Sequence, residues 1–325
     1  MTRLRVFPEH WPLSSTFTIA RGSKSSADVV VVELERDGVR GRGECVPYGH
    51  YGETVAGVIA TIASMDEVVA GGLDRAALQR TMEAGAARNA LDCALWDLEA
   101  KANGTAVAAM VGLEMSPVVT AYTLSLGSPE EMGRAARQHA QRPVLKLKLG
   151  GPEDLERVHA VRENAPTATL IVDANESWSA ESVEPLSQSL HEAGVALIEQ
   201  PLPAGADAML EEITRPVPIC ADESCHNKSD LEAIASRYDA VNIKLDKTGG
   251  LTAALELQKA AQAAGLEVMV GCMVGTSLAM APGMVLAQKA RFVDLDGPLL
   301  LAKDRPEGLR FENGRVHPPR SELWG

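Results

Sequence analysis

The stretch VLKLKLGG, residues 144–151, places two lysines in an otherwise apolar run. In a β-strand, successive side chains point to opposite faces, so Lys146 and Lys148 would share one face and the leucines would take the other. One explanation for two like charges side by side is an edge strand, where lysines discourage association with a second sheet. The remainder of the chain favours another explanation.

From residue 119 onward, short β-rich runs alternate with helix-like segments. The eight runs are VTAYTLSL, VLKLKL, TLIVDAN, ALIEQPL, PICADES, AVNIKLD, EVMVGCM and FVDLDG. In the seven helix-like segments between them, apolar residues recur at spacings of three and four, and capping residues often precede them. This alternation predicts an α/β fold, a modified TIM barrel of parallel strands. The segment after the last strand is too rich in Pro and Gly for an eighth helix, so the expected barrel is (β/α)7β. A closed barrel has no edges, which removes the edge-strand explanation.

The first 118 residues have a different pattern. DVVVVELERDGVRGRGECV reads as a hairpin that turns at Asp37-Gly38, and AGAARNALDCALWDLEAKANG reads as a long amphipathic helix stopped by Asn103-Gly104. We therefore expect an α+β capping domain over residues 1–118 and a catalytic barrel over residues 119–298. The tail, residues 299–325, is expected to return to the capping domain.

Composition limits the partners and the compartment. The chain is 46% hydrophobic and 23% charged, as in globular enzymes and binding proteins, and its net charge of −13 argues against nucleic acid or an anionic membrane as a partner. Five scattered cysteines without CxxC spacing indicate thiols in a reducing compartment. The amino terminus lacks an apolar signal core, so a cytoplasmic location is expected. A homo-oligomer is left open.

Ionisable residues gather at the predicted carboxyl ends of the strands, where barrels of this kind carry their chemistry. They are Lys146, Lys148, Asp173, Glu199, Asp222, Lys244, Asp294 and Asp296. So many charges at one barrel mouth are costly unless a ligand organises them. This pattern predicts a functional site.

Three of these positions predict a metal site. Asp173, Glu199 and Asp222 end three successive strands with no His or Cys among them. Hard carboxylate oxygens suit Mg²⁺, with Mn²⁺ as a substitute, and do not suit Zn²⁺. The alternative is a carboxylate–lysine network that holds no metal.

The motifs LKLKL, DANESW, EQPLP, ADES and NIKLDKTGG, in this order, resemble the enolase superfamily and its muconate-lactonising subgroup. Within it the likeness is greatest to the dipeptide epimerases that act on L-Ala-D/L-Glu. It covers nearly the whole chain, because GECVPYGHYGET and AGAARNALDCALWDLEAK in the first domain take part.

The resemblance implies an isomerase with one Mg²⁺ per subunit, held by the three carboxylates. Lys148 and Lys244 would remove and return the proton α to the carboxylate on opposite faces of the substrate. Lys146 would assist, because its charge near Lys148 favours the neutral base form of that lysine. The implied activity is epimerisation of L-Ala-D-Glu and L-Ala-L-Glu in murein peptide metabolism. A surface lysine at a strand end is the alternative for Lys244.

Substrate recognition is expected away from the reacting carbon. By resemblance, Asp294 and Asp296 in DLD hold the α-ammonium of the dipeptide, and a solvated acidic strand end is the alternative. Arg21 in ARGSKSS would pair with the glutamate side-chain carboxylate, unless it is a solvent-exposed loop residue. Lys24 lies nearby and is not assigned a role.

The rival functions differ in which of these predicted site residues they require. A dipeptide epimerase of other specificity keeps every residue named so far. A cycloisomerase or β-elimination lyase of the same superfamily shares the metal and the lysines but has no use for the paired aspartates. A metal-stabilised binding or scaffold protein would not need both base lysines.

Overall fold

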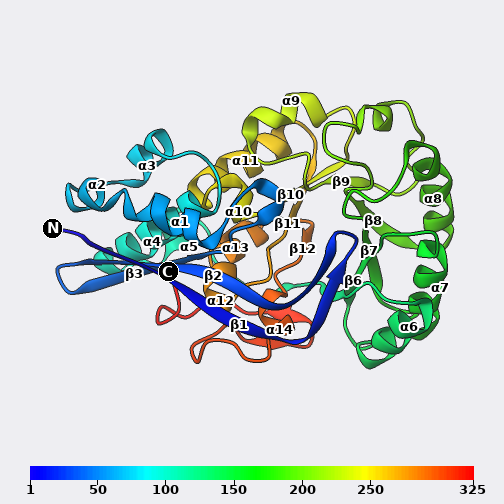
Figure 1. The fold of residues 1–325 in the computed structure, drawn as a ribbon, viewed down its shortest axis with the longest axis horizontal. Helices are drawn as coiled ribbons and strands as arrows, with labels where there is room; N and C mark the ends of the chain where they lie inside the picture. The colour runs from blue at the N-terminus through cyan, green and yellow to red at the C-terminus, as the bar shows by residue number, and fades with distance from the viewer.

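A three-stranded antiparallel sheet and five helices make up the amino-terminal part of the computed structural model, which describes residues 1–325 (Figure 1). The strands are β1 (Arg3–Ile19), β2 (Gly22–Arg36) and β3 (Val39–Cys45). After a 3-10 turn, η1 (Gly49–Tyr51), come α1 (Val55–Ala63), α2 (Asp66–Ala70), α3 (Arg75–Thr81), α4 (Ala86–Asn103) and α5 (Val107–Met110).

Two sequence predictions for this part are confirmed. β2 and β3 pair up to Arg36 and Val39, and both turn residues have positive φ, 53° at Asp37 and 80° at Gly38, as a tight hairpin requires. The long helix α4 ends where Gly104 takes a left-handed conformation. It packs directly on β3, because a Cβ at Gly43 would clash with the backbone oxygen of Ala90.

The second part is an eight-stranded parallel sheet with strands in sequential order, which confirms the predicted fold class. Its strands are β5 (Tyr122–Leu124), β6 (Val144–Lys148), β7 (Thr169–Asp173), β8 (Val195–Glu199), β9 (Ile219–Ala221), β10 (Ala240–Ile243), β11 (Glu267–Val270) and β12 (Phe292–Val293). The backbone N–H of Ala121, just before β5, donates to the oxygen of Val293 in β12 at 2.8 Å. The sheet therefore curls until its first and last strands meet.

Helices cover the outside of this curled sheet (Figure 1). They are α6 (Pro129–Gln138), α7 (Asp154–Asn164), α8 (Ala180–Glu192), α9 (Leu231–Ile234), α11 (Leu251–Ala263) and α13 (Gly283–Ala287). The short helices α10 (Leu245–Thr248), α12 (Ser277–Met280) and α14 (Gly297–Leu300) instead lie against α4, β3 and β1 of the amino-terminal part. Only 3-10 turns form at η2 (Ala208–Glu211) after β8 and at η3 (Lys228–Asp230) before α9. Prolines at 203 and 216 bound the segment after β8, and proline lacks the N–H that a longer helix needs.

The β1–β2 hairpin connects the two parts, because it runs from the amino-terminal sheet across the barrel mouth toward β6 and β7 (Figure 1). Near its tip, the Thr18 N–H donates to Ser125 Oγ at 2.8 Å and the Leu126 N–H donates to the Thr18 oxygen at 3.0 Å. Gly150 makes room for the tip, since a Cβ there would lie 2.7 Å from the Cβ of Ala20. The hairpin thus forms one wall of the barrel mouth.

The carboxyl-terminal tail contacts both parts. β13 (Phe311–Glu312) and β14 (Arg315–Val316) form a small antiparallel sheet with β4 (Val118–Val119). Trp324 Nε1 donates to the Cys93 oxygen at 2.9 Å, so the last residues lie against α4. The division of the chain into domains at residues 118 and 298 stays a prediction.

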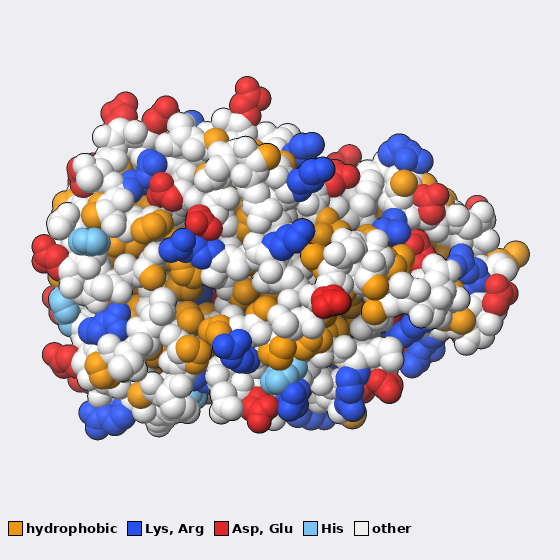
Figure 2. Space-filling view, turned by 180° about the vertical axis from the view of Figure 1, so that it is seen from behind, with side chains coloured by type: hydrophobic (Ala, Val, Ile, Leu, Met, Phe, Trp, Pro, Cys, Tyr) orange, Lys and Arg blue, Asp and Glu red, His pale blue; other side chains and the backbone are white.

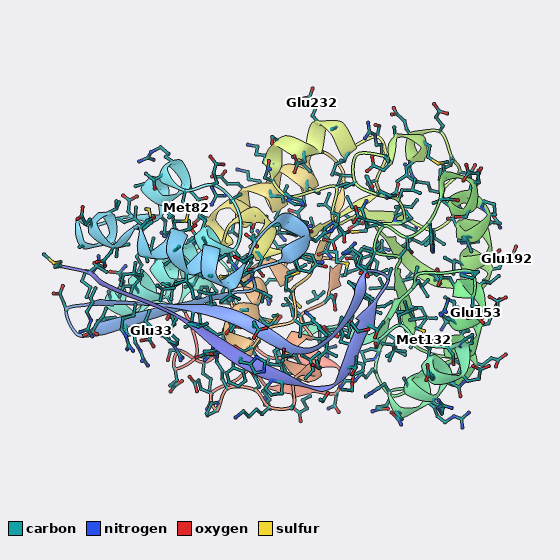
Figure 3. All side chains as sticks on the ribbon, in the orientation of Figure 1. Glu33, Met82, Met132, Glu153, Glu192 and Glu232 are labelled. Atoms are coloured by element: carbon teal, nitrogen blue, oxygen red, sulfur yellow. The ribbon has the colours of Figure 1, made fainter.

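The outer surface is mixed in charge. Glu192 and Glu232 are exposed and point away from the barrel (Figure 3). Acidic and basic side chains are interspersed on the face that Figure 2 shows. None of the helices combines the length and apolar character needed to cross a bilayer.

Candidate active site

The barrel interior is built in layers two residues apart, because alternate side chains of a strand face inward. Five buried apolar residues form the lowest layer: Ile171, Leu197, Cys220, Ala240 and Met269. Two residues further along the same strands stand Asp173, Glu199, Asp222, Asn242 and Gly271. Gly271 is required there, because a Cβ would lie 2.5 Å from Asn242 Oδ1. The polar layer thus rests on a dry apolar floor at the carboxyl ends of the strands.

Lys146 on β6 lies at the centre of this polar layer. Its Nζ is 2.7 Å from Glu199 Oε2, 2.8 Å from Asp294 Oδ2 and 3.3 Å from Asp173 Oδ2. Burial favours the neutral amine, but the carboxylates of Asp294, Glu199 and Asp173 outweigh it and raise the pKa of Lys146 above its usual range. Lys146 is therefore a fixed positive charge.

Lys148 and Lys244 each pair with a different carboxylate. Lys148 Nζ lies 2.5 Å from Asp173 Oδ2, and Lys244 Nζ lies 2.5 Å from Asp222 Oδ2. Lys148 ends β6 and Lys244 follows β10, and three strands, β7, β8 and β9, lie between them in the sheet. In a closed eight-stranded barrel, this separation places the two amines on opposite sides of the mouth.

The three carboxylates predicted to bind a metal are fully buried on adjacent strands. Burial, reinforced by Asp173, raises the pKa of Glu199 to about 7. Lys148 and Lys146 overcome the opposing effect of burial and lower the pKa of Asp173 to about 2. In this structure the acidic side chains are paired with lysine amines and do not converge on one point. The donor chemistry still fits Mg²⁺, because all three are hard oxygen ligands and are buried at the ends of adjacent strands.

Strained backbone follows two of these carboxylates. Asn175, Glu176 and Gln200 have positive φ values of 46°, 67° and 33°, which non-glycine residues rarely adopt. The buried side-chain amide of Gln200 accounts for its unusual backbone conformation, because its Oε1 accepts a hydrogen bond from the Asp222 N–H at 2.8 Å. Its Nε2 donates to Tyr238 Oη at 3.0 Å. Gln200 thus orients the third carboxylate through the backbone.

Asp294 and Asp296 are both buried at the end of β12. The Thr123 N–H donates to Asp296 Oδ2 at 2.6 Å, and Lys146 holds Asp294. Burial and the neighbouring Asp294 raise the pKa of Asp296 to about 7. A cation that entered beside this pair would relieve the repulsion between two buried acids.

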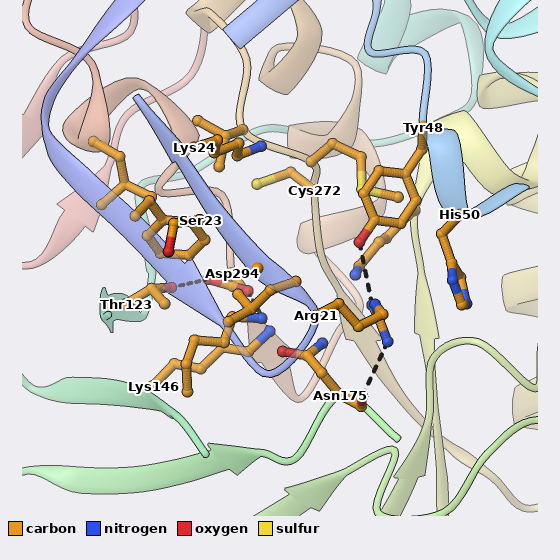
Figure 4. Close-up of a pocket in the computed structure, with 18 of the residues that line it drawn as sticks. Arg21, Ser23, Lys24, Tyr48, His50, Thr123, Lys146, Asn175, Cys272 and Asp294 are labelled. Atoms are coloured by element: carbon orange, nitrogen blue, oxygen red, sulfur yellow. Dashed lines mark hydrogen bonds and ion pairs between the residues drawn. The ribbon is translucent and has the colours of Figure 1, made fainter. Parts of the chain in front are cut away.

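Arg21 at the hairpin tip reaches down to the barrel (Figure 4). Its Nη1 donates to the Asn175 oxygen at 3.0 Å and to Glu176 Oε2 at 2.9 Å, while its Nη2 donates to Glu223 Oε1 at 2.6 Å and to Tyr48 Oη at 3.2 Å. The Arg21 guanidinium therefore adds to the Thr18 hydrogen bonds that hold the hairpin over the strand ends.

All nine predicted site residues come together at one cavity of about 450 Å³. Six of them line it: Arg21, Lys146, Lys148, Lys244, Asp294 and Asp296. The three predicted metal-binding carboxylates lie beneath and contact these lysines. Their roles in binding and catalysis stay predictions.

Several residues at the site were not predicted from the sequence. Lys247 is fully buried, and its Nζ lies 2.7 Å from Asp222 Oδ1 and 2.9 Å from the Asn242 oxygen. Glu176 joins the hairpin to the 48–51 segment, because its Oε2 lies 3.0 Å from His50 Nε2. Lys247 and Glu176 belong to the motifs NIKLDKTGG and DANESW, so a charged residue inside such a motif was the available signal.

Comparisons with known families cover both parts of the chain. The family described as mandelate racemase / muconate lactonizing enzyme, N-terminal domain, matches residues 1–112. The family described as enolase C-terminal domain-like matches residues 131–322.

Two curated relatives match along nearly their full length. The L-Ala-D/L-Glu epimerase of Escherichia coli (strain K12) is 50% identical over 98% of this chain and 100% of its own length. The N-acetyl-D-glutamate racemase of a Pseudoalteromonas species is 44% identical over 91% of this chain and 95% of its own.

Two solved structures carry ligands. An enolase family member of Agrobacterium tumefaciens with homology to dipeptide epimerases, with bound sodium and L-Ala-L-Glu, is 51% identical, with a TM-score of 0.99 and complete coverage of both chains. The dipeptide epimerase of Enterococcus faecalis, complexed with Mg and L-Leu-L-Tyr, is 29% identical, with a TM-score of 0.91 over 98% of this chain and 97% of its own.

Proposed function

Since the chain belongs to the mandelate racemase/muconate lactonizing enzyme family of the enolase superfamily, and to the dipeptide epimerases within it, we propose that this isomerase interconverts L-Ala-D-Glu and L-Ala-L-Glu. The observation that carries the proposal is the placement of Lys148 and Lys244. Each lines the same cavity, and they face it from opposite sides of the barrel. Inversion at a carbon atom needs one group on each face.

The two lysines would act as a base and an acid. One neutral amine takes the α-proton of the glutamate residue, and the ammonium on the other side delivers a proton to the opposite face. In the reverse direction the roles exchange. Lys146 remains charged between Glu199 and Asp294, so its positive field favours the neutral form of a nearby lysine and the negative charge that develops on the substrate carboxylate.

Asp173, Glu199 and Asp222 would hold one Mg²⁺, with Mn²⁺ as a substitute. When bound, the metal supplies Lewis-acid stabilisation of the substrate carboxylate. Neighbouring side chains of the protein hold these carboxylates in place. Gln200 and Lys247 fix Asp222, and Asn242 Nδ2 donates to Glu199 Oε1 at 2.8 Å.

The two ends of the cavity would recognise the two ends of the dipeptide. Asp294 and Asp296 would bind the free ammonium of the alanine residue, because Lys146 forms an ion pair with Asp294 alone and the buried Asp296 beside it has no cation of its own. Arg21 lies at the hairpin tip and would bind the glutamate side-chain carboxylate in competition with Glu176 and Glu223. The substrate is a fragment of murein, so we place the activity in peptidoglycan recycling in the cytoplasm.

A second candidate function is racemisation of N-acetylglutamate, which the Pseudoalteromonas relative favours. That substrate has the same side-chain and α-carboxylates but no ammonium. Asp296, which has no ion-pair partner of its own, would then face an uncharged acetyl group and stay a buried acid without a cation. The paired aspartates therefore favour the dipeptide.

Deuterium exchange tests the proposal. The purified protein is incubated in D₂O with L-Ala-L-Glu, L-Ala-D-Glu or N-acetylglutamate, and ¹H NMR follows the glutamate α-proton. We expect exchange and epimerisation of both dipeptides, loss of both after EDTA treatment and recovery with Mg²⁺. Faster exchange of N-acetylglutamate than of either dipeptide would favour the second candidate, and full activity in metal-stripped protein would contradict the Mg²⁺ requirement.

A further inference from the structure

Cys272, Met273 and Val274, which follow β11, form one wall of the cavity, and Cys272 is labelled among the lining residues in Figure 4. β11 lies between β10 and β12 in the sheet. This wall therefore stands between Lys244, which follows β10, and Asp296, which follows β12. In the proposed function these two residues act on the reacting carbon and on the free ammonium of the dipeptide. The wall would then face the alanine residue, which separates that carbon from the ammonium.

The wall has little hydrogen bonding of its own. It forms neither helix nor strand, and none of the N–H groups of residues 272–275 donates to a backbone oxygen. Before the wall, the Gly271 N–H donates to the Ile243 oxygen at 3.0 Å. After the wall, the Thr276 N–H donates to Glu44 Oε1 at 2.8 Å. The wall is thus held at its two ends, and the second anchor comes from the amino-terminal part of the chain.

A buried ion pair fixes this second anchor. Glu44 on β3 is fully buried, and its Oε2 accepts from the Thr276 hydroxyl and from Arg305 Nη2, the latter at 2.8 Å. Arg305 in the carboxyl-terminal tail also donates through Nε to Thr276 Oγ1 at 2.7 Å and through Nη2 to Glu9 Oε2 at 2.6 Å. Segments from β1, β3 and the tail therefore meet on Thr276, at the end of the wall.

The same anchor lies close to the residue that would bind the ammonium. Gly297 follows Asp296, and a Cβ on Gly297 would lie 3.1 Å from the backbone nitrogen and oxygen of Gly275. Gly275 directly precedes Thr276. A displacement of the anchor would therefore reach both the wall and the backbone beside Asp296.

We propose that Arg305 and Glu44 are positioning residues, which hold the wall in place and thereby restrict the first residue of the dipeptide to a small side chain such as that of alanine. The inference rests on the proposed function and deepens it. Neither residue lines the cavity, so both act through Thr276 and not on the substrate. Charge-assisted hydrogen bonds hold a segment more firmly than neutral ones, and without them the wall yields to a larger side chain.

The test compares L-Ala-L-Glu with L-Leu-L-Glu, which differ only in the first side chain. Arg305→Met should lower the ratio of kcat/KM for Ala-Glu over Leu-Glu by on the order of 10-fold or more, which is what a methylene group is worth in an apolar pocket. The loss on L-Ala-L-Glu should appear mainly in KM, because Lys148 and Lys244 keep their own carboxylate partners. Arg305→Lys should restore part of the ratio, because it keeps a positive charge beside Glu44.

Arg42→Met is the matched control. The Arg42 side chain is 9% exposed and that of Arg305 is 10% exposed. Arg42 Nη1 lies 2.8 Å from Glu307 Oε1, so this pair also joins β3 to the tail, but Arg42 does not line the cavity and forms no hydrogen bond with the wall. Both Arg→Met variants should lower Tm, whereas Arg42→Met should leave the ratio unchanged.

Arg305→Met leaves the Glu44 carboxylate buried without a cation, which is costly for folding. The double variant Glu44→Gln/Arg305→Met removes both charges and should lower the ratio in the same way. A wild-type ratio in these folded variants would overturn the inference, and so would an equal fall of the ratio in Arg42→Met. Failure of the proposed function would instead be seen in the wild type, which would exchange neither dipeptide.

Discussion

Lys247 donates to two oxygens of Asp222, the backbone oxygen at 2.5 Å and side-chain Oδ1 at 2.7 Å. This fully buried lysine, which also donates to the Asn242 oxygen at 2.9 Å, fixes the direction in which the Asp222 carboxylate points. Because Asp222 is a proposed metal ligand, we expect Lys247 to affect metal binding through Asp222, without contacting the substrate.

Lys247→Met should therefore weaken Mg²⁺ binding by about 10- to 100-fold, the usual cost of losing a group that orients a ligand. The measurement is the Mg²⁺ concentration for half-maximal exchange, with Lys259→Met on the exposed face of α11 as the control. Activity should return at high Mg²⁺. An unchanged Mg²⁺ requirement would show that Asp222 keeps its orientation without Lys247.

Replacing one or the other of the two proposed base lysines should affect different stereoisomers of the substrate. Because Lys148 and Lys244 face the cavity from opposite sides, Lys148→Ala and Lys244→Ala should each abolish net epimerisation. Each variant should still exchange the α-proton of one stereoisomer with D₂O, and the stereoisomer should differ between them. NMR of each isomer incubated separately measures this. Equal exchange of both isomers by both variants would contradict a division of the two faces.

Arg21→Met should reduce kcat/KM for L-Ala-L-Glu far more than for L-Ala-L-Leu. The loss of a charge-assisted contact predicts on the order of 30-fold to several thousand-fold for the acidic substrate. Steady-state kinetics with both dipeptides measure the difference. Equal losses on the two substrates would instead assign Arg21 to holding the hairpin through Glu176 and Glu223.

Stability should depend on pH through Asp246, which links the barrel to the capping part. Its Oδ1 accepts from the Val46 N–H at 3.0 Å and from Asn89 Nδ2 at 2.9 Å, and burial raises its pKa to about 7. A carboxyl group with a raised pKa in the folded state binds a proton that the unfolded chain releases above pH ~4. Its contribution to stability is therefore full below that pH and is lost as the pH rises to about 7.

Asp246→Asn keeps a side-chain oxygen that can accept the hydrogen bonds from Val46 and Asn89, and removes the carboxyl group that titrates. The variant should gain free energy of unfolding relative to the wild type between pH 5 and pH 8, by up to about 4 kcal/mol, since one pKa unit corresponds to about 1.4 kcal/mol. Urea unfolding at several pH values measures it. Asp37→Asn in the exposed hairpin turn is the control, and parallel pH profiles for Asp246→Asn and the wild type would contradict the prediction.

The sequence predicted the barrel and its polar layer because both depend on short-range periodicity. Because side chains alternate along a strand, Lys146 and Lys148 face inward while Leu145 and Leu147 face outward. The strand ends in TLIVDAN and ALIEQPL follow the same alternation. The pairing of each lysine with a carboxylate depends on distances between strands, which one sequence does not contain.

Glu176 was missed for a different physical reason. Continuing the strand alternation past Asp173 gives no reason to place Glu176 against the hairpin. The left-handed conformations of Asn175 and Glu176 turn the chain back over the mouth, so Glu176 meets Arg21 and His50. Non-glycine residues rarely adopt such conformations, and no local preference predicts them. Lys247 lies in α10, beyond the end of β10, where strand alternation no longer indicates which side chains face the site.

The β1–β2 hairpin carries a proposed substrate-recognition residue on a different part of the chain from the proposed proton-transfer residues. The two proposed base lysines lie at the ends of barrel strands, whereas Arg21, proposed to recognise the substrate, lies within residues 17–24 of a hairpin that belongs to the other part of the chain. Exchanging those eight residues for others of the same length leaves every base and every proposed metal ligand in place. We therefore expect substitutions within this short segment to change which dipeptides are accepted without removing the proposed bases or metal ligands.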